Sequence, residues 1–157
     1  MMIMYRRIKK ASRNLAQESA LYYVLLIVSV SITGNLQART WYVLSEISTI
    51  GQALEDSASY GDTVLVAPGV YDIISGEDFS INMKNGVVLM SEEGVSVTMI
   101  EAHFTGRAFY CENCDTATAI AGFTITFGLA SNRGSIYCHT ADVIIINNQI
   151  TNKRMFS

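Results

Sequence analysis

The chain has 157 residues, of which 50% are hydrophobic and 16% are charged, with 11 glycines and one proline. This length favours one domain, and the apolar content excludes an intrinsically disordered chain. The low glycine and proline counts exclude collagen-like and low-complexity proteins.

Residues 1–38 have the pattern of an export signal. An uncharged, apolar stretch runs from Ala20 to Ile32, and Leu36-Gln37-Ala38 precedes Arg39. The basic residues before the apolar stretch are Arg6, Arg7, Lys9, Lys10 and Arg13. We predict a cleaved signal peptide over residues 1–38, with an uncleaved signal anchor as the alternative, and a domain at 39–157 that lies outside the cytoplasm.

The exported part is acidic. It keeps 11 − 5 = 6 basic and 14 − 1 = 13 acidic residues, which gives a net charge of −7. A phosphate backbone would be repelled by this charge, so we expect no nucleic acid partner. Membrane contact is expected only through the N-terminal signal.

A short helix is predicted over Ile47–Ala58. Ile47, Ile50, Leu54 and Ala58 follow at steps of three and four residues, which places them on one helix face. Ser45 is the expected N-cap, with Ser48 as the alternative start. A helix of this length needs a surface to pack on.

Short strands separated by turn residues follow the helix, and helical periodicity is absent after Ala58. The predicted strands are Thr63–Ala67, Phe79–Met83, Val87–Met90, Val97–Ala102, Ala108–Glu112, Ala119–Phe127, Ser135–His139 and Asp142–Thr151. Pro68-Gly69 is predicted to form a corner in which glycine takes a positive φ.

The last blocks of sequence repeat each other. Cys111 and Cys138 are 27 residues apart, while Ile125 and Ile150, like Ile120 and Ile145, are 25 residues apart. A strand-rich repeat of this length predicts a solenoid in which like residues stack on successive coils, about 4.8 Å apart. Asn147-Asn148 is expected at a coil corner, with a turn between two hairpin strands as the alternative.

Four sequence elements resemble the right-handed parallel β-helix proteins of the pectin-lyase-like superfamily. They are Gly61-Asp62-Thr63-Val64, Pro68-Gly69-Val70-Tyr71, Gly122-Phe123-Thr124-Ile125 and Asn147-Asn148-Gln149-Ile150, in that order after a cap helix. The resemblance covers about residues 41–153 and implies an all-β, right-handed parallel β-helix. We expect about four coils with a short N-terminal capping helix, and a truncated domain, because family members run far longer.

The fold alone does not fix a function. Our first hypothesis is an exported β-helix repeat module without catalytic activity that binds polysaccharide or serves as a cell-surface structural element. One alternative is the N-terminal fragment of a polysaccharide lyase or glycoside hydrolase whose catalytic coils lie beyond residue 157. Another is a fragment of an adhesin or autotransporter passenger. An uncapped last coil also predicts self-association.

Enzymes of this fold would need clustered carboxylates and a basic residue. The candidates are Glu101, Glu112, Asp115 and Asp142, with Arg107 and Arg133. No Asp-Asp pair exists in the chain. We therefore interpret these carboxylates as solvated surface groups and assign no catalytic residue.

Cys111, Cys114 and Cys138 are the three cysteines. We favour Cys111 and Cys138 stacked inside the coil, with a disulfide as an alternative, because export permits oxidation. Zinc held by the three cysteines and His139 is a weaker alternative. His103 has no visible partner and is interpreted as a solvated loop residue, so neither a metal nor a cofactor is expected.

Aromatic residues recur through the predicted coils, and some of them could form a flat surface for sugars. Most are expected to pack in the core. They are Tyr71, Phe79, Phe104, Phe109, Tyr110, Phe123, Phe127 and Tyr137.

Overall fold

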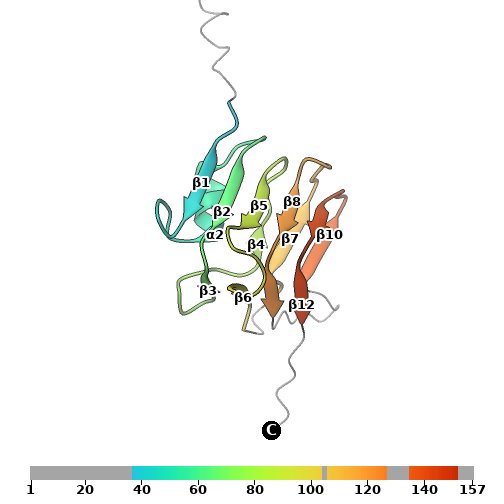
Figure 1. The fold of residues 1–157 in the computed structure, drawn as a ribbon. Helices are drawn as coiled ribbons and strands as arrows, with labels where there is room; N and C mark the ends of the chain where they lie inside the picture. The colour runs from blue at the N-terminus through green and yellow to red at the C-terminus, as the bar shows by residue number, and fades with distance from the viewer. Residues whose placement is uncertain (1–36, 104–105, 127–134, 152–157) are drawn as a thin grey trace, which may run out of the picture. The chain divides into compact units, whose positions relative to one another are not determined.

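In a computed structural model, residues 37–103, 106–126 and 135–151 are described, and the predicted signal segment lies almost wholly outside them. Residues from Ala38 onward form one compact unit. Within this unit the chain winds as a parallel β-helix, confirming the predicted fold (Figure 1). One of its three sheets has four strands, one for each of four coils.

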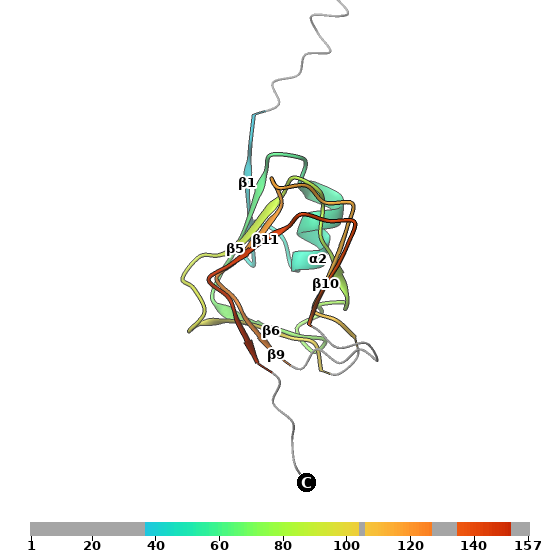
Figure 2. The same cartoon turned by 90° about the vertical axis from the view of Figure 1, so that its right-hand side faces the viewer.

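Three parallel sheets form the sides of the coil, and Figure 2 shows them along the winding axis. The first sheet contains β1 (Thr40–Val43), β2 (Thr63–Val66), β5 (Val88–Ser91), β8 (Ala119–Ala121) and β11 (Ile144–Ile146). The second contains β3 (Gly69–Tyr71), β6 (Thr98–Glu101), β9 (Thr124–Thr126) and β12 (Gln149–Thr151). The third contains β4 (Ile81–Asn82), β7 (Phe109–Glu112) and β10 (Ile136–His139).

Like residues stack in register through the core, as the repeat predicted. Ile145 pairs with Ile120, Ile150 with Ile125, and Cys138 with Cys111. Ile145 ends a column of stacked side chains that runs from coil to coil through Ile120, Leu89 and Val64, and these three are fully buried. Since alternate residues of a strand point to opposite faces, one apolar residue in two is enough to fill this core.

Two predicted strands each contain a corner. Ala119–Phe127 is interrupted at Gly122, with φ of 82°, and Asp142–Thr151 is interrupted at Asn147, with φ of 53°. Asn148 joins the two corners: its Oδ1 accepts the N–H of Phe123 at 2.9 Å, and its Nδ2 donates to the Ile120 carbonyl at 2.8 Å. The expected coil corner is confirmed, and the strands are shorter than predicted because each coil must turn there.

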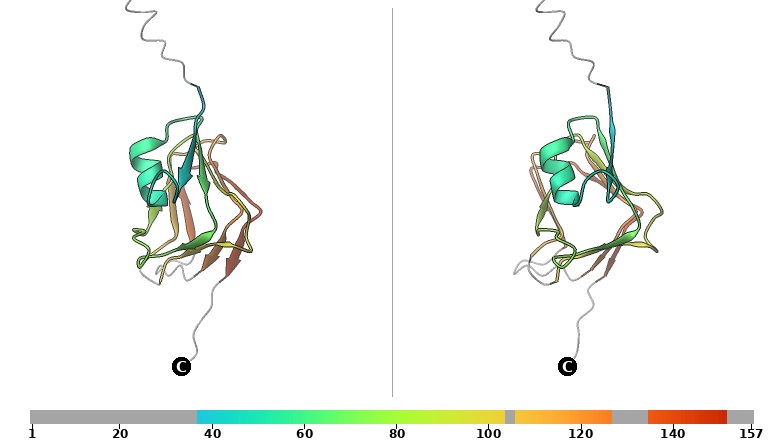
Figure 3. Two further views of the ribbon diagram at one scale, coloured as in Figure 1. Left: turned by 60° about the vertical axis from the view of Figure 1, so that its left-hand side comes forward. Right: turned by 90° about the vertical axis from the view of Figure 1, so that its left-hand side faces the viewer.

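The predicted cap helix is shorter than expected. It consists of α2 (Ile50–Gln52) and a π-helical turn, η1 (Ala53–Ser57), at the end of the coil where the chain enters (Figure 3). Thr49 is its N-cap, and its side chain accepts the N–H of Gln52 at 3.1 Å, so the prediction of Ser45 or Ser48 was wrong. Ile50 and Leu54 are buried as predicted, together with Ala53.

A buried acid from the loop between β3 and β4 adds to the Thr49 cap. The Glu77 carboxylate accepts the N–H groups of Ile50 and Gly51, each at 2.8 Å. These N–H groups have no partner within the helix, so a charged acceptor from a distant loop satisfies them. Desolvation raises the pKa of Glu77, and the two N–H groups oppose this effect.

The corner at Pro68 differs from the prediction. Gly69 does not have a positive φ and instead begins β3, a strand that the sequence did not predict. Tyr71 closes this corner, because its hydroxyl donates to the Ala67 carbonyl at 2.8 Å. Val64 and Val66 are buried in the core, and Leu65 between them is half-buried.

The last described coil has a neighbouring coil on one side only. Ile145 and Ile150 continue buried core columns, yet they are 43% and 53% exposed. Among the described residues, the end formed by β10, β11 and β12 therefore exposes apolar core side chains, and each of its strands pairs on one side.

Candidate functional site

Two carboxylates project side by side where β3 and β6 end. Tyr71 pairs with Ile100 in the ladder, and both side chains are buried in the core. The next residues, Asp72 and Glu101, therefore point outward from neighbouring coils. His103 follows Glu101 by two residues and has a positive φ of 45°, which turns the chain at this point.

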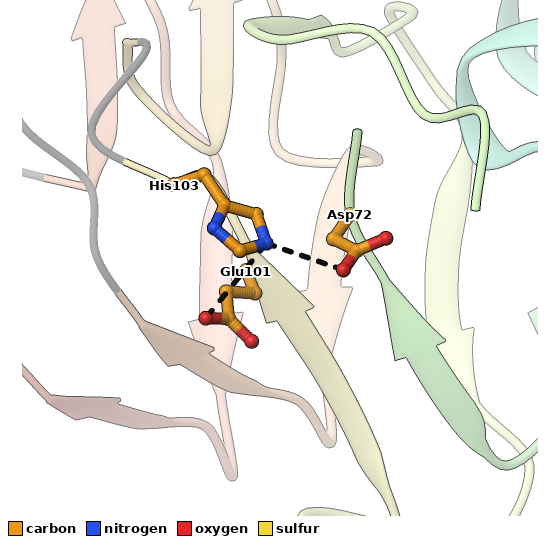
Figure 4. Close-up of side chains that lie close together, drawn as sticks. All are labelled: Asp72, Glu101 and His103. Carbon is orange, nitrogen blue, oxygen red and sulfur yellow. Dashed lines mark hydrogen bonds and ion pairs between the residues drawn. The ribbon is translucent and has the colours of Figure 1, made fainter. Parts of the chain in front are cut away.

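The His103 imidazole lies between the two carboxylates (Figure 4). Its Nε2 is 3.2 Å from Asp72 Oδ2 and 3.9 Å from Glu101 Oε1. The first distance is a hydrogen bond, and the second is too long for one. We call Asp72, Glu101 and His103 the acidic–histidine cluster, and its three potential ligand atoms lie within 4.8 Å of one another.

A short turn orients Asp72. Its Oδ1 accepts the N–H of Ser75 at 2.7 Å, which leaves Oδ2 directed toward His103. The pKa of Asp72 is lowered, mainly by the Ser75 N–H, while desolvation opposes the shift and the hydrogen bond with His103 adds to it. Asp72 is thus held as a carboxylate.

The interpretation of His103 as a solvated residue without a partner was wrong. Its side chain is 33% exposed and its partners come from two coils. Asp72 was not recognised as a candidate at all. Aligning the Tyr71 and Ile100 columns would have placed Asp72 beside Glu101, but that register could not be set from the sequence.

The other candidate carboxylates do not gather with this cluster. Glu101 ends a strand of the second sheet and Glu112 a strand of the third, so the two carboxylates lie on different sides of the coil. Asp115 accepts the Tyr60 hydroxyl at 3.0 Å, and Asp142 is exposed. Arg133 lies outside the described residues.

A second feature is an aromatic surface on the outside of β7 and β10. Tyr110 and Tyr137 pair in register and stack with ring centroids 5.3 Å apart and an interplanar angle of 22°. The His139 ring is nearly parallel to that of Tyr137, at 8° and 6.4 Å. This separation is about the 6.6 Å between alternate residues of a strand, so the two rings lie side by side.

Charged groups border this aromatic surface. The guanidinium carbon of Arg107 lies 4.1 Å from the centre of the Tyr137 ring, and Glu112 Oε1 lies 3.4 Å from His139 Nδ1. We call Arg107, Tyr110, Glu112, Tyr137 and His139 the aromatic face. It offers ring surface, a cation and an anion within one strand pair.

Most other aromatic candidates are structural. Tyr71, Phe109 and Phe123 are buried in the core, and Phe79 packs against it. Phe104 and Phe127 lie outside the described residues. Sequence alone could not separate these rings from Tyr110 and Tyr137, because the difference is the face of the strand.

The three cysteines are free thiols. Cys111 and Cys114 are buried, and Cys138 is exposed on the last coil. Desolvation raises the pKa of both buried thiols, and the adjacent Cys138 adds to the shift at Cys111. Among the described residues, the acidic–histidine cluster is the single His/Cys/Asp/Glu group close enough to share an ion, so the cysteines and His139 do not form the zinc site considered above.

Comparison with known proteins identifies one similar family. Its description is "Protein of unknown function (DUF1565)", and it matches residues 45–107, from the segment before the cap helix to the loop before β7. The matched region contains the whole acidic–histidine cluster and Arg107, whereas the tyrosines of the aromatic face lie beyond it. No curated protein and no solved structure matches the chain.

Within the described ranges, no helix has the length and apolar character needed to cross a membrane.

Proposed function

We propose that this chain is an exported β-helix module that binds polysaccharide through the aromatic face. The observation that carries the proposal is the Tyr110–Tyr137 stack with Arg107 over it and His139 beside it, on the outer side of the third sheet. The N-terminal basic and apolar segments support export, and the net charge of −7 after residue 38 argues against nucleic acid as the polymer.

Sugar rings present flat C–H faces that pack on aromatic rings, and their hydroxyl groups bond to nearby charged side chains. The aromatic face supplies both kinds of contact. Tyr110 covers one side of the Tyr137 ring, while His139 extends the ring surface along the strand. Arg107 and Glu112 stand at its border as donor and acceptor.

The parallel coil suits a long, repetitive ligand. Successive coils repeat the same outward positions about every 4.8 Å, so a polymer lying across them meets equivalent side chains more than once. Asn82 precedes Tyr110 and Tyr137 in this column, which adds an amide to the row. A single small sugar would contact only part of the row, so we expect polymers to bind more tightly than monosaccharides.

Binding to immobilised neutral and uronate-containing polysaccharides tests the proposal. Tyr137→Ala should weaken binding at least about tenfold, a loss of roughly 1.4 kcal/mol. The matched control is Tyr42→Ala, because Tyr42 is 40% exposed on β1 of another sheet. Equal loss in both variants, or no binding to any polymer by the parent chain, would refute the assignment.

Catalysis and export have separate tests. Incubation with pectate and calcium should give no unsaturated products, and their appearance would instead support the lyase alternative. N-terminal sequencing of the chain after secretion should begin near Arg39, while a retained Met1 would contradict cleavage.

A further inference from the structure

The acidic–histidine cluster carries more negative charge than its described surroundings balance. Asp72 and Glu101 occupy neighbouring positions on adjacent coils, an arrangement in which like charges repel. Among the described residues, His103 is the one cationic or potentially cationic group that forms an ion pair with either of them. Its Nε2 carries at most one proton, and the hydrogen bond to Asp72 uses it.

A second observation comes from the next coil. Thr126 pairs with Glu101 across the β6–β9 ladder, and it is 4% exposed. Its neighbour Ile125 is fully buried in the core column, so Thr126 projects from the same outer face as Glu101. The Thr126 Oγ1 is buried and has no hydrogen-bond partner among the residues that the structure describes.

A buried hydroxyl without a partner costs free energy, and natural structures rarely leave one unless a ligand completes it. Here the hydroxyl stands in a column with two carboxylates. The hydroxyl oxygen has lone pairs that can bind a cation, as the carboxylates and the imidazole do.

From this arrangement we infer that Asp72, Glu101, His103 and Thr126 bind one divalent first-row transition metal ion. Mixed imidazole and oxygen donors suit manganese and zinc, while a thiolate-rich site would select softer ions. For zinc, bonds of 2.0–2.1 Å in a tetrahedral site place neighbouring ligand atoms about 3.3 Å apart. The observed 3.2 Å and 3.9 Å separations need little adjustment to reach that geometry.

The inferred ion would also join three coils. Asp72 follows β3, Glu101 ends β6, and Thr126 ends β9. An ion bound to all three would tie successive coils together at one corner, so binding should stabilise the fold as well as neutralise the cluster. This inference does not depend on polysaccharide binding, because the aromatic face uses a different set of residues.

Manganese is the better probe, because the three free thiols would compete for zinc. Titration of the purified chain with Mn²⁺, with free ion measured by electron paramagnetic resonance, should give one bound ion per chain. His103→Gln and Glu101→Gln should each weaken binding at least about tenfold. The matched control is His139→Gln, which removes an exposed histidine that also faces a glutamate.

Thr126→Val gives a further check, because it keeps the shape of the side chain and removes only the hydroxyl. It should weaken manganese binding without lowering the melting temperature of the metal-free chain. Circular dichroism confirms that each variant is folded, and a rise in melting temperature on adding Mn²⁺ should be lost with His103→Gln. Absence of binding at millimolar Mn²⁺, or equal binding by the parent chain and the His103 and Glu101 variants, would overturn the inference.

Discussion

Replacing Asp62 with alanine should weaken the junction between the first strand and the turn that follows the cap. Asp62 is 7% exposed, and its carboxylate accepts three hydrogen bonds. Oδ1 accepts the N–H of Arg39 at 2.8 Å, and Oδ2 accepts the Trp41 indole at 3.1 Å and the N–H of Ser59 at 2.9 Å. One side chain therefore joins the start of the coil to the end of the cap.

The size of the effect follows from what happens to the three donors. A hydrogen bond to a charged group contributes about 1.5–3 kcal/mol when its donor stays buried after the loss. Arg39 and Ser59 are exposed and Trp41 is partly so, which lets water replace the carboxylate. We therefore expect about 1 kcal/mol for each bond, or roughly 3 kcal/mol of unfolding free energy for Asp62→Ala.

The same contacts give the effect a pH dependence. Desolvation acts to raise the pKa of Asp62, but the donors at Arg39, Trp41 and Ser59 outweigh it and hold the pKa below the ordinary 3.8. Since the pKa of Asp62 is lower in the folded than in the unfolded chain, its carboxylate stabilises the fold above pH 3.8. That stabilisation is lost as the pH falls through the folded pKa. The difference in unfolding free energy between the parent chain and Asp62→Ala should therefore decrease below pH 3.8.

Urea unfolding followed by circular dichroism measures this difference, with the denaturant slope checked for constancy. Asp56→Ala is the matched control, because it removes an exposed carboxylate from the neighbouring helical turn. It should change stability by less than about 0.5 kcal/mol. A loss at Asp62 no larger than that of the control, or one that is constant through pH 3, would refute the reasoning.

Three further predictions concern the cap and the corners. Leu54→Ala should lower the free energy of unfolding in urea by about 2–5 kcal/mol, because Leu54 is 1% exposed. Leu44→Ala is the control and should change it little, because Leu44 is 59% exposed. Gly86→Ala should lower the melting temperature, because φ at Gly86 is 74° and the added methyl group would overlap the Tyr60 ring. Combining it with Tyr60→Ala should restore only the part of the melting temperature that the overlap removes. Full recovery in the double variant would contradict backbone strain at Gly86. Asn148→Ala should cost about 1–2 kcal/mol, since two backbone bonds are lost, and an unchanged denaturation midpoint would show that water replaces them.

The repeat of apolar residues was enough to predict the coil. Pairs such as Ile120 with Ile145 and Ile125 with Ile150 were aligned from spacing alone, and the ladder confirms them. The reason is local: a strand buried on one side needs an apolar residue at every second position, and stacked coils need the same residue types at the same positions.

The sequence was less informative where distant groups replaced local ones. Ser45 and Ser48 were reasonable caps by residue type, but Thr49 caps the helix and Glu77 supplies the remaining acceptors. Strand β1 was missed because its four residues become a strand by pairing with β2. The Glu77 contact and the β1–β2 pairing each join segments more than 20 residues apart, whereas the Thr49 cap is a local contact.

The sequence by itself determined the winding, the inward columns and the position of the capping segment, because these depend on short-range periodicity and on a repeat of 25 to 27 residues. Only the tertiary structure decided which outward side chains meet. Asp72 and His103 are 31 residues apart, and they meet because β3 and β6 are neighbours in register. A shift of one residue in that register would turn Asp72 toward the core and remove the cluster, so the site depends on packing that no local pattern encodes.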